Sequence, residues 1–156
     1  MKRSDYRLKN SADAYPTRVC KRRLDSPEAT RLITWNVERG QGPLRTQERN
    51  VIVTALRFFD RRRYKLRGFV VMDDHVHVLI DTFNSFPVFQ VIHSWKSFTA
   101  HEFIRRCWRW EKTWKRGSHE NVIASKCRLY RALRYIELNP VRRWPGVLAY
   151  PWVWIE

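Results

Sequence analysis

The chain has 156 residues, with 31 Lys and Arg against 15 Asp and Glu, which gives a formal net charge of +16 at pH 7. This length allows one domain with a hydrophobic core and leaves little room for a second. Aromatic residues make up 14% of the chain, which excludes the aromatic-poor composition of a disordered protein. The charge favours nucleic acid as partner, although an anionic membrane surface, or no polyanion at all, also fits the charge alone.

Cysteine usage and hydropathy indicate a cytoplasmic protein. Cys20, Cys107 and Cys127 are far apart and form no C-x-x-C pair, so neither a disulfide framework nor a zinc site follows from them. The N-terminus has no apolar signal core, and no apolar run approaches the ~20 residues that span a bilayer. We therefore expect neither secretion nor insertion into a membrane.

Residues 1–30 are polar and basic without a sustained period, which predicts a loosely ordered arm, equally compatible with plain disorder and with contact to a phosphate backbone. This arm holds 8 basic and 4 acidic residues, so 23 basic and 11 acidic residues remain in the part from 31 to 156. Most of the positive charge thus belongs to the predicted folded domain.

From residue 31 the patterns predict alternating strands and helices. In chain order they are a strand at 31–38, a helix at 46–63, strands at 64–71 and 75–81, a helix from Pro87 to about Arg106, a strand near 123, and a helix at 126–139 that Pro140 ends. The apolar stripe of the first helix is predicted to be Val51, Ala55, Phe58 and Phe59. The order predicts an α+β single domain with a central antiparallel sheet flanked by helices.

His75 and His77 lie in one predicted strand, separated by a single valine. A period of two places both imidazoles on the same face, about 6 to 7 Å apart at Cβ, where they can bind one divalent ion. Taken alone, the spacing is also that of two histidines without a common ligand.

The last predicted helix carries a phenol, an amide and two guanidinium groups on one stripe. At ~100° per residue, Arg128, Arg131, Tyr135 and Asn139 fall within roughly 80°, and the predicted core side is formed by other residues: Leu129, Leu133 and Ile136. If this helix packs across the histidine strand, Asn139 could complete a metal site beside Tyr135. The alternative is an ordinary amphipathic helix with a basic face.

A tyrosine, a divalent ion and guanidinium groups together suit attack on a phosphodiester. The ion polarises the phosphate, and the guanidinium groups stabilise the negative charge that develops. The product would be a phosphotyrosine ester, which keeps the bond energy for rejoining. Two alternatives remain open: a non-catalytic DNA-binding or regulatory protein, and a hydrolytic metal-dependent nuclease, for which Asp73 and Asp74 are available.

Several segments resemble landmarks of the REP-associated tyrosine transposases, single-tyrosine members of the HUH group. The matching segments are MDDHVHVLI, HSWKSFTAHEF, WKRGSHENVI, RYIELNPVRR and YPWVWIE, in this order from about Arg31 to the C-terminus. The resemblance implies an HUH endonuclease-like fold with a ferredoxin-like core. It also implies metal-dependent cleavage and transfer of single-stranded or hairpin DNA at repetitive palindromes.

The resemblance assigns roles to individual positions. His75 and His77 match the paired metal ligands, Asn139 matches a further ligand, and Tyr135 matches the nucleophile that is left on a 5′-phosphate. The implied ion is Mg²⁺ or Mn²⁺, and the protein is expected to act as a monomer or homodimer. Asp73 departs from the family, which usually has proline there, and this affects the expected turn geometry.

Basic residues supply the predicted DNA contacts, since phosphate contacts provide most of the affinity for nucleic acid. Tryptophans among them, Trp108, Trp110 and Trp114, could stack on unpaired bases or belong to the core. The predicted DNA-binding residues are Arg57, Arg61, Arg62, Arg63, Lys65, Arg67, Lys115, Arg116, Arg128, Arg131, Arg142 and Arg143.

Overall fold

A computed structural model describes residues 28–156, so the predicted arm at 1–30 lies almost wholly outside the described residues. Within the described range the chain forms β1 (Thr30–Asn36), α2 (Thr46–Phe58), β2 (Tyr64–Val71), β3 (His75–Thr82), α3 (Val88–Cys107), β4 (His119–Val122), α4 (Lys126–Arg143) and β5 (Val153–Ile155). No helix in this range is long and apolar enough to cross a membrane.

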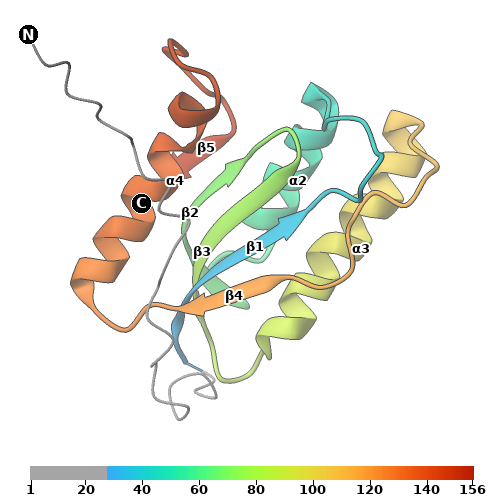
Figure 1. The fold of residues 1–156 in the computed structure, drawn as a ribbon. Coiled ribbons are helices and arrows are strands. Elements are labelled where there is room, and N and C mark those ends of the chain that lie inside the picture. The colour runs from blue at the N-terminus through green and yellow to red at the C-terminus, as the bar shows by residue number, and fades with distance from the viewer. Residues whose placement is uncertain (1–27) are drawn as a thin grey trace, which may run out of the picture.

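The strands form one antiparallel sheet in the order β4-β1-β3-β2-β5. Helices α2 and α3 lie on one side of the sheet and α4 lies on the other (Figure 1). The structure thus confirms the predicted α+β domain with a central antiparallel sheet. Because β3 is in the middle and both faces are covered, its side chains point alternately into two different interiors.

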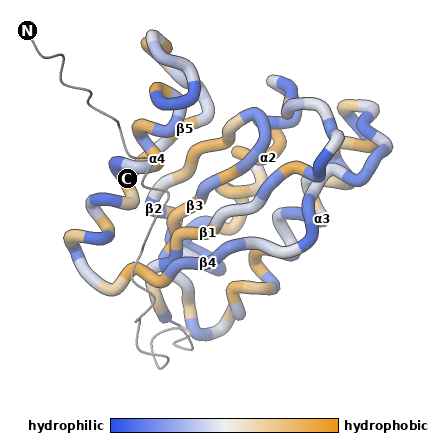
Figure 2. Tube along the Cα trace, in the orientation of Figure 1, coloured by the Kyte–Doolittle hydropathy of each residue, from blue (hydrophilic) through white to orange (hydrophobic). Residues whose placement is uncertain are grey.

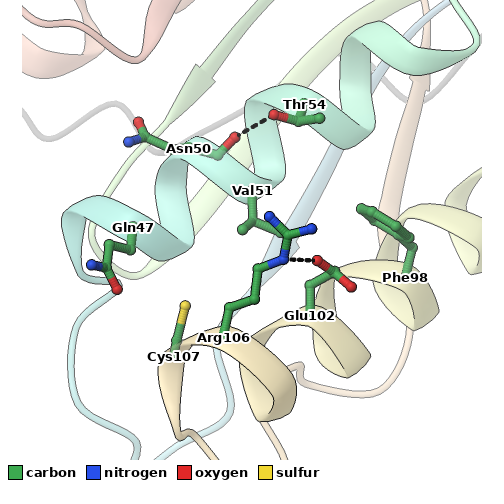
Figure 3. A pocket seen from close by; sticks show the side chains of 8 residues that line it. All are labelled: Gln47, Asn50, Val51, Thr54, Phe98, Glu102, Arg106 and Cys107. Atoms are coloured by element: carbon green, nitrogen blue, oxygen red, sulfur yellow. Dashed lines mark hydrogen bonds and ion pairs between the residues drawn. The ribbon is translucent and has the colours of Figure 1, made fainter.

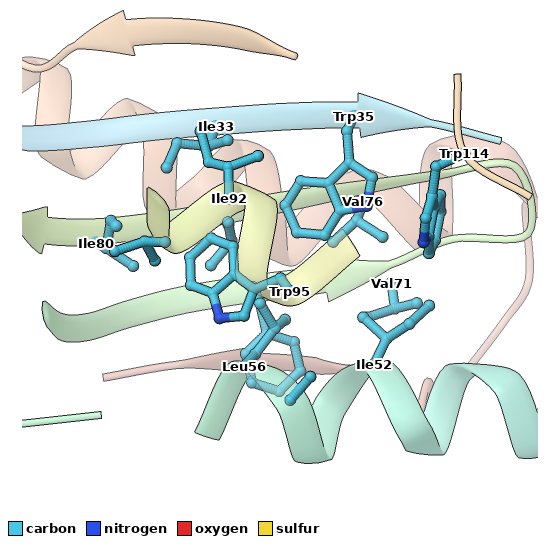
Figure 4. Close-up of a cluster of buried hydrophobic side chains, with 14 of the residues drawn as sticks. Ile33, Trp35, Ile52, Leu56, Val71, Val76, Ile80, Ile92, Trp95 and Trp114 are labelled. Atoms are coloured by element: carbon cyan, nitrogen blue, oxygen red, sulfur yellow. The ribbon is translucent and has the colours of Figure 1, made fainter. Parts of the chain in front are cut away.

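The larger interior lies between the sheet and the helices α2 and α3. Val76, Val78 and Ile80 of β3 are each 0% exposed and pack there. Figure 4 shows this cluster, in which the stacked rings of Trp35 and Trp95 lie 5.7 Å apart between their centroids. Since alternate residues of β3 face this core, the residues between them must face α4.

The smaller interior lies between the sheet and α4. Leu79 of β3 and Ile136 of α4 are both fully buried in it. Hydrophilic and apolar residues alternate along α4 (Figure 2), as expected of a helix with one face on a sheet. His75 and His77 share the Leu79 side of β3, so they face α4.

Gly68, next to a bulge in β2, allows β5 and α4 to approach this strand closely. The pairing of β2 with β3 shifts between Leu66 and Gly68. A side chain at Gly68 would lie 3.1 Å from the carbonyl oxygen of Trp154 and 3.4 Å from Leu133. Glycine is therefore needed where β5 and α4 meet β2.

The predicted end and stripe of the first helix were wrong. Helix α2 ends at Phe58 rather than at Arg63, because Arg61 has a positive φ of 61° and turns the chain into β2. The buried positions are Glu48, Ile52, Ala55 and Leu56, whereas Phe58 is 64% exposed. Of the four predicted core positions, only Ala55 is fully buried, and Val51 and Phe59 are half-buried.

The predicted end of the last helix was also wrong. Helix α4 continues through Pro140 to Arg143. A proline inside a helix removes one backbone donor. The helical hydrogen bonds nevertheless continue after it, since the amide of Trp144 donates to the carbonyl of Pro140 at 2.8 Å. The extra turn carries Arg142 and Arg143 past Tyr135 on the same helix.

Candidate functional site

His75 and His77 lie side by side on the face of β3 that α4 covers. Their ring centroids are 4.7 Å apart. His77 is buried, with 6% of its surface exposed, whereas His75 is half-buried. The predicted convergence of the two imidazoles on one face is therefore present.

His77 is held between β1 and α4. Its Nδ1 lies 2.7 Å from the hydroxyl oxygen of Thr34, and its Nε2 lies 3.1 Å from the hydroxyl oxygen of Tyr135. Burial, together with the nearby His75, lowers the pKa of His77 to about 3. The ring is thus neutral at pH 7, which is the form that binds metal ions.

Thr34 was not among the site residues predicted from the sequence. Its contact with His77 arises because β1 pairs with β3 in the register that places Thr34 opposite His77. A metal-binding histidine usually has its second ring nitrogen fixed by such a partner. In β1, Thr34 stands between the core residues Ile33 and Trp35, so alternation places it on the other face of the sheet. This alternation is the sequence signal that could have indicated a polar group on the face of the histidines.

His75 is anchored by its neighbour in the chain. Its Nδ1 lies 2.5 Å from a carboxylate oxygen of Asp74. Burial favours the neutral form of Asp74, but the interaction with His75 outweighs it and holds the pKa of this carboxyl below its ordinary value. Both histidines therefore have Nδ1 engaged.

Helix α4 supplies the groups opposite the histidines. Its first turn is capped by the hydroxyl of Ser125, which accepts from the backbone amide of Arg128 at 3.3 Å. Further along, the guanidinium of Arg142 lies over the ring of Tyr135, 5.6 Å from its centroid. The next residue, Arg143, donates to Asp73 at 3.2 Å, which joins the end of α4 to the turn before His75.

The burial of Asn139 differs from the prediction, which placed it on a stripe of α4 outside the core side. The residue is buried, with 8% of its surface exposed, and Tyr135 is half-buried. Asn139 is buried because α4 packs on the sheet over this part of its surface, together with Ile136, whereas Arg131 of the same predicted stripe is exposed. Within residues 28–156, no three His, Cys, Asp or Glu side chains form a group that could hold a metal ion. A role for Asn139 as the third ligand therefore stays a prediction.

The predicted DNA-binding residues lie at both ends of the sheet. Arg142 and Arg143 are close to the histidines, and Lys115 precedes β4 at the same end, with its amide bonded to the carbonyl of Asn36. At the opposite end, Tyr64 pairs with Thr82, seven residues along β3 from His75. The two ends of β3 are therefore ~23 Å apart, at about 3.3 Å per residue.

The densest basic cluster, Arg61–Arg63, is at this distant end, just before Tyr64. Near it, Lys65 and Arg67 form ion pairs with Glu156 at 3.0 and 2.8 Å. Arg57 lies over the rings of Phe69 and Trp154, and Arg128 and Arg131 belong to the first half of α4. The predicted set is thus not one patch, and Lys65 and Arg67 already have anionic partners.

The three tryptophans that could stack on bases have different environments. Trp114 is 6% exposed and its indole nitrogen donates to the hydroxyl of Thr99 at 2.9 Å, so it belongs to the core. Trp108 and Trp110 are 77% and 67% exposed. Only the latter two remain available to a base.

A hollow between α2 and α3 lies apart from the histidines and Tyr135. It has a volume of about 400 Å³, and Figure 3 shows the side chains that line it. Its one carboxylate, Glu102, is paired with Arg105 and Arg106. The histidines face the other side of the sheet, so this hollow has no access to them.

Comparison with known proteins identifies a family and two solved structures of similar fold. Residues 42–138 match the model of a family described as IS200-like transposase. A REP-associated tyrosine transposase, solved bound to a REP hairpin, has a TM-score of 0.66 and 19% identity, covering 80% of this chain and 75% of its own. A structure from Deinococcus radiodurans R1, described as a transposase, has a TM-score of 0.53 and 17% identity, covering 70% and 89%. No curated protein matches.

Proposed function

Because the family match spans more than half of the chain, the protein belongs to the IS200-like transposase family, and we propose that it cleaves and transfers single-stranded DNA through Tyr135. The observation that carries this proposal is the 3.1 Å contact between the Tyr135 hydroxyl and Nε2 of His77, beside His75. A family of transposases implies an enzyme that cuts DNA, and the proposal concerns how this member does so.

In the proposed step, the phenolic oxygen of Tyr135 attacks a DNA phosphorus. A bond forms between that oxygen and the phosphorus, and the bond to the 3′ oxygen of the preceding nucleotide breaks. The phenol loses its proton and the departing 3′ oxygen becomes a free hydroxyl. The guanidinium of Arg142, which lies over the Tyr135 ring, is placed to stabilise negative charge on the phosphate.

The donor set fits a divalent ion, Mg²⁺ or Mn²⁺. His77 is neutral, and with its Nδ1 on Thr34 the lone pair of Nε2, which faces the Tyr135 hydroxyl in this structure, would turn to the ion when one is bound. His75 and His77 would hold the ion, with Asn139 as the proposed third ligand. Such an ion, when bound, withdraws charge from the phosphate oxygens and orients the leaving group.

We further propose that the substrate is hairpin DNA of the REP-like palindromic type. Support comes from the shared fold with a transposase that was solved on a REP hairpin. Exposed arginines on α4, such as Arg131 and Arg142, give the protein cations on both sides of Tyr135. The hairpin sequence would be read elsewhere, since phosphate contacts carry no base information.

The test is the covalent adduct with DNA. Tyr135→Phe should abolish the adduct that wild type forms with labelled single-stranded hairpin DNA and Mn²⁺, while hairpin binding persists, because one oxygen atom is lost. Tyr130→Phe is the matched control on the same helix, since Tyr130 is 64% exposed. An adduct with Tyr135→Phe would refute the proposal.

The same assay separates the other two candidates. Cleavage without an adduct by Tyr135→Phe would indicate a hydrolytic nuclease, and binding without any cleavage by wild type would indicate a DNA-binding protein. The geometry does not favour the nuclease, because the carboxylates that it would use are engaged: Asp73 accepts from Arg143, and Asp74 contacts His75.

A further inference from the structure

A groove of about 380 Å³ lies between the first half of α3 and the segment that leads into β4. In Figure 1 the chain returns from the end of α3 beside that helix before it enters β4. The returning segment is held in place by Lys96 of α3, whose ammonium group donates to the carbonyls of Lys115 and Gly117 at 2.7 and 2.8 Å. The groove therefore has walls fixed to each other.

Two aromatic rings are exposed on the α3 wall. Phe89 is 65% exposed and lines the groove. His93 follows one turn later, is also exposed, and lines the same groove. Side chains four positions apart on a helix lie one above the other, so the two rings form a surface about two bases long.

The facing wall is positively charged. Lys115 and Arg116 are exposed, and neither side chain forms an ion pair within the described part of the chain. Of the other charged groups on the groove, Lys112 pairs with Glu38 at 2.6 Å, Glu120 pairs with Arg31 at 3.7 Å, and the ammonium of Lys96 is bound to the two carbonyls. The cations without partners thus face the exposed rings.

The segment that forms the charged wall of the groove also lies beside the candidate site. The segment from Lys115 to Ser118 also borders a small hollow that Thr34 and Asn36 line. Thr34 is the residue whose hydroxyl contacts His77. A DNA strand that places a phosphate at Tyr135 would therefore reach the groove by passing this segment.

We infer that the groove binds unpaired nucleotides of the strand that flanks the cleavage site, with bases against Phe89 and His93 and phosphates against Lys115 and Arg116. Exposed aromatic rings beside cations are the pattern of proteins that bind single strands, because only unpaired bases offer their faces for stacking. A duplex stem would use the cations but leave Phe89 in water. The inference rests on the proposed function, since it concerns the same DNA strand.

The experiment compares two oligonucleotides: a hairpin alone, and the same hairpin flanked by single strands of about six nucleotides. Phe89→Ala should raise the Kd of the flanked hairpin about tenfold, as expected for the loss of one stacked base. Its Kd for the bare hairpin should stay at the wild-type value. Phe98→Ala is the matched control, since Phe98 is also on α3, is 46% exposed and is not part of the groove.

The outcomes separate this inference from the proposed function. If Phe89→Ala binds the flanked hairpin like wild type, or loses both oligonucleotides equally, the groove is not a single-strand site, even where the Tyr135 adduct still forms. If Phe89→Ala weakens only the flanked hairpin and no adduct forms, the groove stands and the tyrosine chemistry falls. A change in molecular mass by light scattering with unchanged DNA binding would make the surface a protein contact and overturn the inference.

Discussion

Tyr135 and His77 are 58 positions apart in the chain, yet the phenolic oxygen of one lies 3.1 Å from Nε2 of the other. The contact exists because α4 packs on the face of β3 that carries both histidines. Thr34 fixes the same imidazole from β1. Three elements thus hold the proposed reacting groups, and sites on packed elements are better fixed than sites on loops.

The Thr34 contact predicts an effect on metal affinity. Thr34→Val keeps the branched shape that suits a strand but removes the hydroxyl beside Nδ1 of His77. We expect the Mn²⁺ concentration for half-maximal adduct formation to rise about 10- to 100-fold, the usual loss when such a partner is removed. The measurement is adduct formation against Mn²⁺ concentration. Thr54→Val is the control, since its hydroxyl contacts only a carbonyl of its own helix, and an unchanged Mn²⁺ requirement in Thr34→Val would contradict the prediction.

Arg142 gives a prediction for the chemical step. Its guanidinium lies over the Tyr135 ring, so Arg142→Ala should slow adduct formation at saturating DNA by at least about tenfold. Hairpin affinity should change less, because many other cations remain. Rapid-quench measurement of the adduct gives the rate. Arg134→Ala, also on α4 but paired with Glu137, should react at the wild-type rate.

Arg61 and Arg62 lie at the end of the sheet away from the histidines. Replacing both with Glu should weaken binding to hairpins of different sequence alike and reduce the dependence of Kd on salt, because such contacts are to phosphates. Adduct formation at saturating DNA should be unaffected at a distance of ~23 Å. Anisotropy titrations at several salt concentrations test the first part. Unchanged affinity would exclude this end from the DNA surface.

The sequence predicted β2 fully and β3 to within one residue, because alternation there is regular and the bounding turns are short. It also placed His75 and His77 on one face, since that depends only on the period of a strand. The sequence could not show that both faces of the sheet are covered. The burial of Asn139 and the contact from Thr34 both depend on this tertiary arrangement.

Helix ends were less predictable because local rules compete with packing. Pro140 predicted the end of α4, but the helix continues because its buried contacts stabilise it. The apolar pattern of α2 predicted Phe58 as a core residue, whereas the structure buries Ile52. A buried carboxylate, Glu48, occupies the core side of α2, which no hydrophobic pattern indicates. Likewise, the sequence could not show that the predicted DNA-binding residues lie at two opposite ends of the sheet.

Glu48 is 0% exposed and lies among guanidinium groups. It accepts from Arg109 at 2.7 Å and from Arg45 at 2.9 Å. Arg109, which follows α3, also donates to the carbonyls of Gly42 and Pro43, which precede α2. The carboxylate of Glu48 and the guanidinium of Arg109 thus join α2 to the segments before α2 and after α3. Burial favours the neutral acid, but the hydrogen bonds from Arg45 and Arg109 outweigh it and lower the pKa of Glu48.

Glu48→Gln should therefore destabilise the fold by about 3–5 kcal/mol at pH 7, because it leaves the buried side of Arg109 without its charge partner. A carboxyl with a lowered folded-state pKa contributes stability that is complete above its unfolded pKa of about 4.3 and is lost as the pH falls through the folded value. The difference in unfolding free energy between wild type and Glu48→Gln should thus shrink below about pH 4. Urea unfolding from pH 7 to pH 3 measures it, with Glu137→Gln, an exposed carboxylate paired with Arg134, as a control expected within about 0.5 kcal/mol of wild type. A difference that stays constant down to pH 3 would mean that Glu48 does not stabilise the fold through its charge.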